Sequence, residues 1–541
     1  MSKKICFTEF MKTIPKIPEI REEELTPLVT ALVEIIRIQQ EQIQELRDEI
    51  ARLKGHKPKP KIKPSVLEKY FENKEAKKES KKRPGSTKRE KTANLEIHET
   101  VIVRVDNVPP GSMFKGYEEF TVQGLVFQPH NTLYRRERWQ TPEGASIVAQ
   151  LPEEIKRLGS HFDSSLQAFI LYQYYHCHVT QPLIWEQLRE LGFDISTGQV
   201  NRIITEGKEC FHAEKEAILE VGLEISSYVN VDDTSARHKG KNGYCTHIGN
   251  DLFAWFETSH GKSRINFLGM LRAGNKDYAL NPTAFDYMKT QKLPVAKIEL
   301  LTNCGQTVFD DYTEWRLALE SLGFTKDRHI RIATEGALLG SIRKNELINP
   351  DLVILSDDAG QFDVLRHALC WIHAERSINR LVGYNDAQRE SLAQIKTQIW
   401  EFYAELKAYK QTAAPEKKTE LQDRFDQIFT TRTCYERLNQ AINRIHKNKP
   451  ELLLVLDRPE VPLHNNMSET DIREYVKKRK ISGSTRSDLG RRCRDTFASL
   501  KKTGRKLGIS FWRFLEDRVS GKNLIPSLPD LMRQRIPVSP I

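Results

Sequence analysis

The sequence lacks the cysteine pairs and the long apolar runs that define several protein classes. Its 541 residues include eight cysteines, and none of them lies in a Cys-x-x-Cys pair or in the spacing of a disulfide framework. The first ten residues contain no continuous apolar stretch of a signal peptide, and no later window reaches membrane-spanning length. These absences argue against a disulfide-rich secreted domain and a membrane protein, so a cytoplasmic protein without a membrane partner is expected.

One cluster, His176-Cys177-His178, brings metal-ligating side chains together. It lies in a tyrosine-rich stretch of an expected helix, and no further ligands follow at suitable spacing. Core packing is therefore favoured over metal binding. No zinc is expected.

Acidic residues are in short supply relative to basic ones. The formal net charge is +11 and the isoelectric point is near 9.0, which indicates a polyanionic partner without separating nucleic acid from a membrane surface. Residues 54–91 hold 15 Lys or Arg and only 5 Asp or Glu. With its low apolar content, the segment 55–95 is predicted to be a flexible basic linker that follows phosphates without reading bases. A solvated linker without a ligand is an equal alternative for any one lysine.

Residues 25–53 repeat apolar side chains at alternating steps of four and three. The repeating positions are Leu25, Val29, Leu32, Ile36, Gln39, Ile43, Leu46, Ile50 and Leu53. This heptad seam predicts a coiled coil over 21–54, in which Gln39 fixes the register at some cost in stability. An amphipathic helix docked on its own protein is the alternative. Self-association is favoured because the basic linker isolates the helix, so a homo-oligomer is expected.

Two further modules are predicted before the central region. Short alternating runs at 101–105 and 120–127 predict a small β module over 96–151. Residues 152–222 turn helical, and residues 181–204 have the pattern of a helix-turn-helix. Gly192 would permit the turn, and Ser196 or Thr197 would cap the second helix. The expected shared core is Leu183, Leu188, Leu191, Val200 and Ile203. The second helix would offer Gln199, Asn201 and Arg202 to a DNA groove, although many helical hairpins share this pattern.

Three acidic residues stand where carboxylates are well placed for metal binding. Asp232 ends the apolar run 225–231, Asp357 follows the run 352–355, and Glu469 opens a helix-like stretch. The runs 225–232, 244–249 and 252–258 predict a three-stranded antiparallel meander, and a fourth strand at 352–356 would lie beside the first. This layout predicts an α/β ribonuclease-H-like core in which Asp232 and Asp357 leave neighbouring strand ends.

Carboxylates that meet at one point suit two Mg²⁺ ions acting on a phosphodiester, because Mg²⁺ prefers oxygen ligands. Histidine or thiolate would select softer ions. Each acid alone has an ordinary structural explanation, since aspartate often forms turns after strands and glutamate often balances a helix dipole. Arg473, Lys477, Lys478 and Arg479, on the helix of Glu469, are candidate phosphate contacts.

Four ordered motifs carry a family resemblance. They are Val231-Asp-Asp-Thr, Leu355-Ser-Asp-Asp-Ala-Gly-Gln-Phe, Leu369-Cys-Trp-Ile-His-Ala-Glu-Arg and Pro462-Leu-His-Asn-Asn-Met-Ser-Glu-Thr-Asp-Ile-Arg. In this order they resemble the DDE transposases of the insertion-sequence sixty-six family, over most of the chain. The resemblance implies that Asp232, Asp357 and Glu469 bind two Mg²⁺ ions, with Mn²⁺ as a substitute. His373 would be an auxiliary residue, although helix packing explains it equally well.

The chain departs from the family pattern at several points. The zinc-binding cysteines that the family usually has before the helix-turn-helix are missing, so 96–151 would be a metal-free remnant. The family's Asp-Asn-Asn opening is His464-Asn-Asn here, with Asn466 kept as an auxiliary candidate. Asp233 and Asp358 adjoin the two favoured aspartates, so the choice within each doublet stays open.

The resemblance implies a DNA transposase that cuts the ends of an insertion sequence and joins them to target DNA in a prokaryotic, nucleoid-associated setting. It leaves open whether small accessory proteins of the element are needed. The expected core spans 223–383 and 450–515, with a helical insertion at 384–449 and a tail at 516–541. A structure-selective nuclease of the same fold and an inactive DNA-binding descendant are the alternatives.

Overall fold

The computed structural model describes residues 96–535, apart from 105, 107, 108, 111, 116, 119 and 347, together with Val29, Ile36 and Gln39. The expected coiled coil over 21–54, those three residues apart, and the basic linker over 55–95 lie outside the described residues. No helix among the described residues is both long and apolar enough to cross a bilayer.

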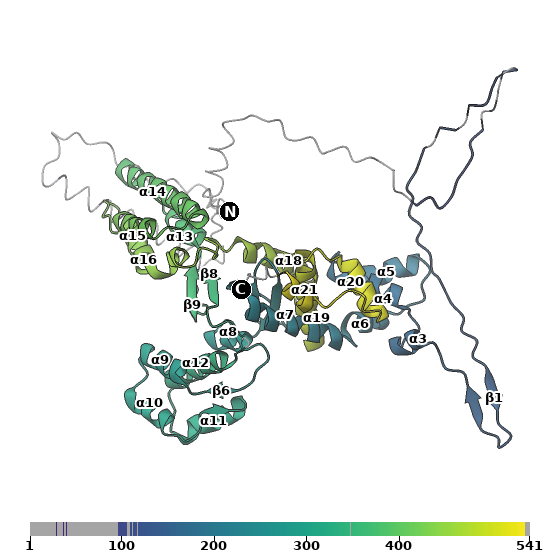
Figure 1. Cartoon of the computed structure of the whole chain (residues 1–541), viewed down its shortest axis with the longest axis horizontal. Coiled ribbons are helices and arrows are strands. Elements are labelled where there is room, and N and C mark those ends of the chain that lie inside the picture. Colours follow the sequence, from purple (N-terminus) through teal and green to yellow (C-terminus); the bar gives the residue numbers. More distant parts are fainter. Residues whose placement is uncertain are drawn as a thin grey trace, which may run out of the picture.

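The segment 96–151 forms much less sheet than its alternating sequence predicts. The only strands described in it are the short antiparallel pair β1 (Arg138–Gln140) and β2 (Ser146–Val148). The strands expected at 101–105 and 120–127 are wrong for the residues described there, and Val103 and Phe120 are 86% and 91% exposed. An alternating strand needs a surface on which to bury its apolar face. Among the described apolar side chains of these two runs, Phe127 packs against Phe169, whereas the others are well exposed. In Figure 1 the segment extends away from the helices that follow it.

The next helices are α3 (Glu153–Leu158), α4 (Ser164–Tyr175), α5 (Gln181–Glu190), α6 (Thr197–Thr205) and α7 (Glu209–Ile225). Helices α5 and α6 form the expected helical hairpin. Gly192 adopts a φ of 88° just after α5, and the Ser196 side chain accepts a hydrogen bond from the Gln199 backbone N–H, so both predicted local features are present. The prediction for Leu183 is wrong by one residue: Leu183 is 54% exposed, whereas Ile184 is fully buried.

A five-stranded mixed sheet forms the centre of the molecule. Its strands are β3 (Tyr228–Ser235), β4 (Tyr244–Gly249), β5 (Ala254–Ser259), β8 (Val353–Ser356) and β9 (Arg366–Leu369), in the order β5-β4-β3-β8-β9. The first three strands pair antiparallel, and β3-β8 and β8-β9 pair parallel. The predicted meander and the position of the fourth strand beside the first are confirmed. Strand β3 extends to Ser235, however, so Asp232 does not end it.

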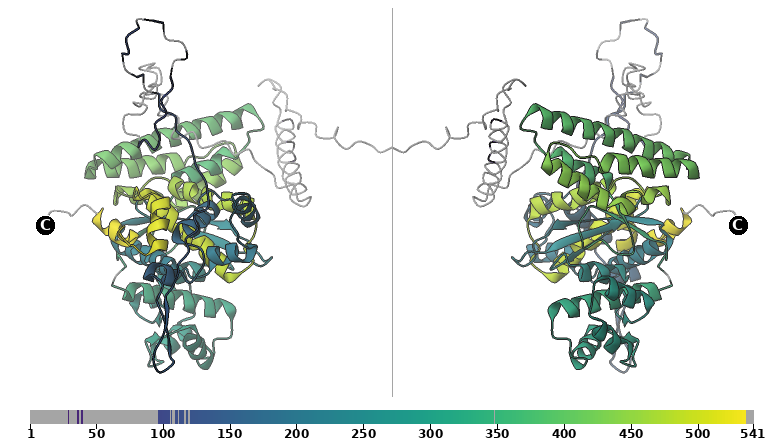
Figure 2. Two further views of the ribbon diagram at one scale, coloured as in Figure 1. Left: turned by 90° about the vertical axis from the view of Figure 1, so that its right-hand side faces the viewer. Right: turned by 90° about the vertical axis from the view of Figure 1, so that its left-hand side faces the viewer.

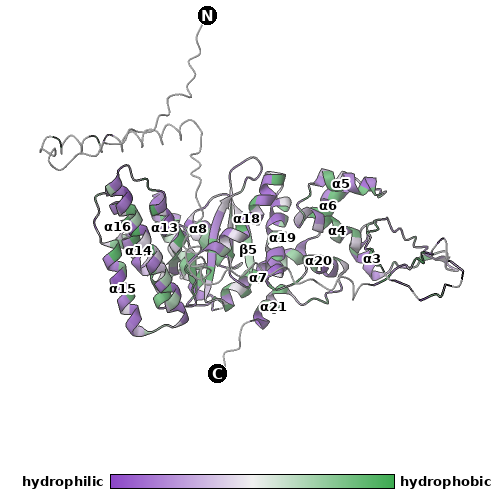
Figure 3. Ribbon diagram, turned by 90° about the horizontal axis from the view of Figure 1, so that it is seen from above, coloured by the Kyte–Doolittle hydropathy of each residue, from purple (hydrophilic) through white to green (hydrophobic). Residues whose placement is uncertain are grey.

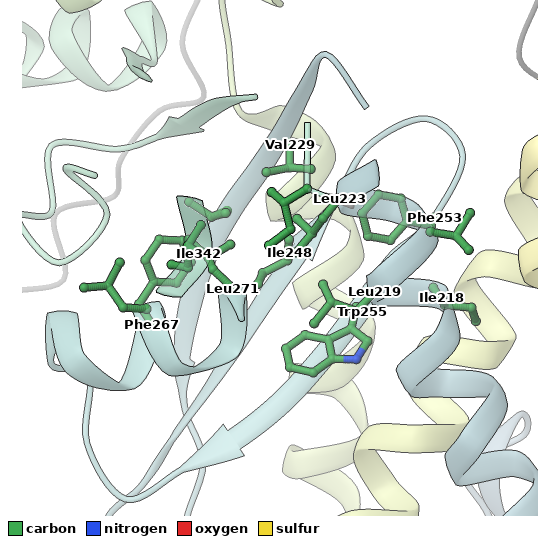
Figure 4. Packing of buried hydrophobic residues seen from close by; sticks show 14 of the residues in the cluster. Ile218, Leu219, Leu223, Val229, Ile248, Phe253, Trp255, Phe267, Leu271 and Ile342 are labelled. Atoms are coloured by element: carbon green, nitrogen blue, oxygen red, sulfur yellow. The ribbon is translucent and has the colours of Figure 1, made fainter. Parts of the chain in front are cut away.

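Different cores cover the two faces of this sheet. On one face, Val229, Ile248 and Trp255 pack with residues of α7 and of the helices that follow the meander, as Figure 4 shows. On the other face, Phe256 packs with Ile472 and Tyr475. The latter two residues belong to α18 (Asn466–Ser482), which is followed by α19 (Asp488–Lys506), α20 (Phe511–Ser520) and α21 (Leu528–Gln534).

Side chains of α19 cover the free edge of β5. The backbone N–H groups of Ala254, Phe256 and Thr258 donate hydrogen bonds to Thr503, Ser499 and Asp495, respectively. An uncovered edge strand would present these donors to other chains. The edge of the sheet is therefore closed within this protein.

Two helical insertions leave the sheet on opposite sides. The first contains α8 (Arg264–Leu271), α9 (Pro282–Thr290), α10 (Val295–Thr302), α11 (Tyr312–Ser321), α12 (Asp327–Lys344) and the small pair β6 (Tyr278–Ala279) and β7 (Val308–Phe309). The second contains α13 (Trp371–Asn379), α14 (Asp386–Gln411), α15 (Pro415–Phe429), α16 (Glu436–Lys447), α17 (Lys449–Leu452) and a 3-10 turn (Leu454–Leu456). Figures 1 and 2 show the two insertions with the sheet between them.

The insertions differ in how they are anchored. The first shares the large apolar core of the sheet and of the helical hairpin, whereas the second has an apolar core of its own, centred on residues such as Trp371, Phe402 and Phe425. Seen from above in Figure 3, α14–α16 and the hairpin α5–α6 lie at opposite ends of the molecule.

Candidate active site

Asp232 and Asp357 are level with each other on neighbouring strands. Strands β3 and β8 pair in parallel with Asn230 opposite Leu355, and continuing that register by two residues places Asp232 opposite Asp357. Burial raises the pKa of Asp232 to about 7, and the adjacent Asp357 acts in the same direction, as do Asp233 and Glu469. These carboxylates thus lie close enough to repel one another.

Glu469 reaches this region from a different element, the first turn of α18. Its Oε1 atom accepts a hydrogen bond from Nη1 of Arg376 at 2.9 Å. The Nε2 atom of His373 lies 3.7 Å from the same oxygen, and Nη2 of Arg473 lies 3.7 Å from Oε2. His373 and Arg473 were predicted from the sequence, whereas Arg376 was not. The Cys-Trp-Ile-His-Ala-Glu-Arg block does point to Arg376, because it lies three residues after His373 and positions three apart on a helix share a face.

His373 is close enough to both Asp357 and Glu469 for their charges to act on its pKa. Burial lowers its pKa, with Arg376 acting in the same direction, while Asp357 and Glu469 oppose that shift. Its Nε2 atom is 3.2 Å from Nη1 of Arg376. The side chain is therefore placed at the carboxylates rather than in a core remote from them.

The two doublets separate by the face of the sheet. Asn230 and Asp232 are two residues apart on β3, so they project to the same face, and Asn230 contacts Asn465, which precedes α18. Asp233 projects to the other face, where its carboxylate accepts a hydrogen bond from Gln361 at 2.8 Å. Only the first aspartate of this doublet projects toward the helix that carries Glu469.

The second doublet shows a similar division. The Asp358 carboxylate accepts a hydrogen bond from Nε of Arg444 at 2.9 Å and pairs with a second nitrogen of the same guanidinium. Arg444 belongs to α16 of the second insertion. Asp358 therefore attaches that insertion to the end of β8, while Asp357 lies next to Asp232.

The asparagine before Glu469 with the closest connections to the site is Asn465, not the candidate Asn466. Asn465 is 1% exposed and contacts β3, whereas Asn466 is only half-buried and begins α18. Sequence spacing could not separate the two, because either lies within one turn of Glu469.

The candidate DNA contacts are unequally accessible. Asn201, Arg202, Arg473 and Lys477 are exposed, whereas Gln199 is half-buried and accepts a hydrogen bond from Arg202. Lys478 is 5% exposed and donates to the Tyr174 carbonyl at 2.7 Å, and burial lowers its pKa to about 7. Arg479 donates to Thr234 and Ser235 at the end of β3. As placed, Lys478 is not available to a phosphate.

The carboxylate oxygens of Asp232, Asp357 and Glu469 are the type of ligand that a hard divalent cation prefers. The atoms that face one another are carboxylate oxygens, and their mutual repulsion is the condition that such a cation relieves. Among the described residues, no group of three or more His, Cys, Asp or Glu is close enough as placed to form a metal cluster. Arg376 instead provides the positive charge beside Glu469, so closure of a three-carboxylate site would need Glu469 to leave that guanidinium.

The His176-Cys177-His178 cluster lies away from this site. His176 stacks on Tyr172 with ring centroids 4.4 Å apart, which is a packing contact.

Comparison with known proteins gives two matches. The model of the family described as Transposase IS66 family matches residues 357–492, which include Asp357, His373 and Glu469. A curated relative, "Uncharacterized protein y4jO" of Sinorhizobium fredii (strain NBRC 101917 / NGR234), is 41% identical over 308 residues, which make up 56% of this chain and 94% of the relative. The family match thus covers two of the three acids and the segment that joins them.

Proposed function

Since the chain belongs to the IS66 (insertion-sequence sixty-six) transposase family, we propose that it is a DDE transposase that cuts the ends of an insertion sequence and joins them to target DNA. The observation that carries the proposal is the placement of Asp232 level with Asp357, on the sheet face toward the helix of Glu469. The mixed sheet, antiparallel from β5 to β3 and parallel from β3 to β9, is consistent with a ribonuclease-H-like core.

Asp232, Asp357 and Glu469 would hold a pair of Mg²⁺ ions, which when bound supply Lewis-acid stabilisation of the attacking and leaving oxygens; Mn²⁺ would substitute. The protein's own part is to bring the carboxylates together and to hold the DNA. His373 and Arg376 border the same carboxylates and offer positive charge or hydrogen bonds to the scissile phosphate.

DNA would be held by surfaces on both sides of the carboxylates. Exposed Arg473 and Lys477 on α18 would contact phosphates close to the site, and Asn201 and Arg202 on α6 would reach a groove of the element end. Arg479 donates a hydrogen bond at the end of β3, so it would hold the strand that carries Asp232 in place and would not contact a phosphate. The oligomer expected from residues 25–53 would bring two ends together.

Strand cleavage and strand transfer with labelled element-end duplexes and a supercoiled target plasmid, in Mg²⁺ or Mn²⁺, tests the proposal. Asp232→Ala, Asp357→Ala and Glu469→Gln should each reduce end cleavage by roughly 10²–10³-fold or more, because each removes a group that acts on the transition state. End binding in a gel-shift assay should be retained. Asp358→Ala is the matched control, and its cleavage should persist because its carboxylate is bound to Arg444.

Each other outcome points to a different function. Cleavage that survives Asp232→Ala and is lost in Asp233→Ala would move the metal-binding role to the neighbouring residue. Cleavage by the wild-type protein without any joined product would favour a structure-selective nuclease. End binding without cleavage at any metal concentration would indicate an inactive descendant of a transposase.

A further inference from the structure

Asn465 contacts, directly or through one residue, all three segments that carry the acids. Its side chain donates a hydrogen bond to the Val231 carbonyl at 2.7 Å, one residue before Asp232. Its backbone N–H donates to Sγ of Cys370 at 3.2 Å, and the Cys370 N–H donates to the carbonyl of Ser356, one residue before Asp357, at 2.9 Å. Its own carbonyl accepts the N–H of Glu469 at 3.3 Å.

The amide of Asn465 is used in both directions. Its oxygen accepts a hydrogen bond from Nδ2 of Asn230 at 2.8 Å while its nitrogen donates to Val231, so one side chain grips two consecutive residues of β3. Both asparagines are almost completely buried. A buried polar side chain with donor and acceptor both used fixes one geometry, because any displacement leaves a buried group unpaired.

A second contact holds the same turn of α18 against the sheet. Oγ of Ser468, the residue before Glu469, lies 2.6 Å from Nδ1 of His247 on β4, and both side chains are fully buried. The start of α18 is therefore attached to β3 through Asn465 and to β4 through Ser468. Glu469 lies between these attachments and the guanidinium of Arg376.

From these contacts we infer that Asn465 is a positioning residue that sets how closely the three carboxylates approach, and so how tightly the site binds a divalent cation. Aspartate cannot replace it, because a carboxylate offers no donor to the Val231 carbonyl and adds a further negative charge beside Asp232. Alanine removes both side-chain bonds and frees the start of α18 from β3. The inference rests on the proposed function only in that the cation is taken to bind Asp232, Asp357 and Glu469.

The test measures Mn²⁺ binding to the full-length chain from the electron paramagnetic resonance signal of free Mn²⁺. Asn465→Ala and Asn465→Asp should weaken the tightest Mn²⁺ binding at least tenfold. The matched control is Asn466→Ala, one residue along, whose affinity should stay within twofold of wild type. Circular dichroism melts show whether each variant is folded, and Asn230→Ala, which loses only one of the two side-chain bonds, should show a smaller loss if Asn465→Ala does not fold.

A cleavage titration supplies a second readout that a merely structural role would not move. Raising the Mn²⁺ concentration should restore end cleavage in Asn465→Ala, because its carboxylates are present but misplaced, and should not restore it in Asp232→Ala. Wild-type Mn²⁺ affinity in a folded Asn465→Ala overturns the inference and leaves the proposed transposase intact. Conversely, Mn²⁺ binding that depends on Asn465 in a protein that never cleaves an end supports the inference and overturns the proposed function.

Discussion

Two stretches of this chain carry the same kind of alternating apolar sequence and adopt opposite structures. Val101-Ile-Val-Arg in the segment 96–151 is exposed and forms no strand, whereas Tyr228-Val-Asn-Val in β3 lies at the centre of the sheet. Val103 is 86% exposed and Val229 is fully buried. The difference lies in what each stretch can pack against. Strand β3 has neighbours on both edges and cores on both faces, and residues 101–104 have neither.

The comparison shows that alternation specifies which face would be buried but not whether a partner surface exists. In β3 the second face is also partly polar, and Asn230 is stable there because its amide bonds to Asn465. A pattern of residues in one strand cannot encode that partner, which lies more than two hundred residues away in the sequence.

The largest effect should come from placing a charge in each stretch. Val229→Asp buries a carboxylate in the main core and should cost about 4 kcal/mol or more, a large part of the stability of a typical domain. Val103→Asp should change the free energy of unfolding by less than about 0.5 kcal/mol, because its side chain is already in water. Urea unfolding followed by circular dichroism compares the two variants.

The control for this pair is a change that keeps the side chain apolar. Val229→Ile adds one methylene to the core and should cost no more than roughly 1–3 kcal/mol, so the protein should stay folded, while Val103→Ile should melt like the wild type. A loss of stability in Val103→Asp that depends on protein concentration would break the comparison, since it would show that the segment is buried in an assembly of chains.

Much of the central fold could be predicted from the sequence, and the omissions have physical causes. The runs at 225–232, 244–249, 252–258 and 352–356 predicted strands because short apolar runs bounded by turn residues are a local signal in the sequence. The helix start at Glu469 was also readable. Asn465 and Arg376 were missed because their importance lies in contacts with β3 and with Glu469, and one sequence alone does not show such long-range pairs.

A medium effect should distinguish the two neighbouring residues on α5 where the sequence prediction was one position out. Ile184→Ala removes a fully buried side chain and should cost roughly 2–5 kcal/mol, while Leu183→Ala should cost less than about 0.5 kcal/mol. Hydrogen exchange of the α5 amides measures this local stability. Equal protection in the two variants would mean that the helix presents a different face to its core, and would restore Leu183 to the shared core.

The smallest effect concerns Lys478, a charged side chain that is buried although its type is usually exposed. Its pKa falls to about 7 because burial disfavours the ammonium, with Arg494 and Lys501 acting in the same direction. Below pH 7 the folded protein must keep the buried charge, and this cost is relieved as the pH rises from about 7 toward the unfolded-state pKa near 10.5. Lys478→Met should therefore stabilise the protein by roughly 1–3 kcal/mol at pH 6, with the gain shrinking toward pH 10.

Unfolding by urea at pH 6, 8 and 10 measures the trend, and Lys477→Met, at the exposed neighbouring position, is the matched control whose stability should change little at any of these pH values.

DNA binding should separate Lys477→Met from Lys478→Met in the opposite sense. Lys477→Met should weaken binding and reduce its salt dependence by about one phosphate contact, while Lys478→Met should leave both unchanged. A loss of affinity in Lys478→Met as large as in Lys477→Met would mean that the buried ammonium leaves the Tyr174 carbonyl to meet DNA. Helix α18 would then change its packing against α4 when the complex forms, because the Tyr174 contact is the one that holds Lys478 inside.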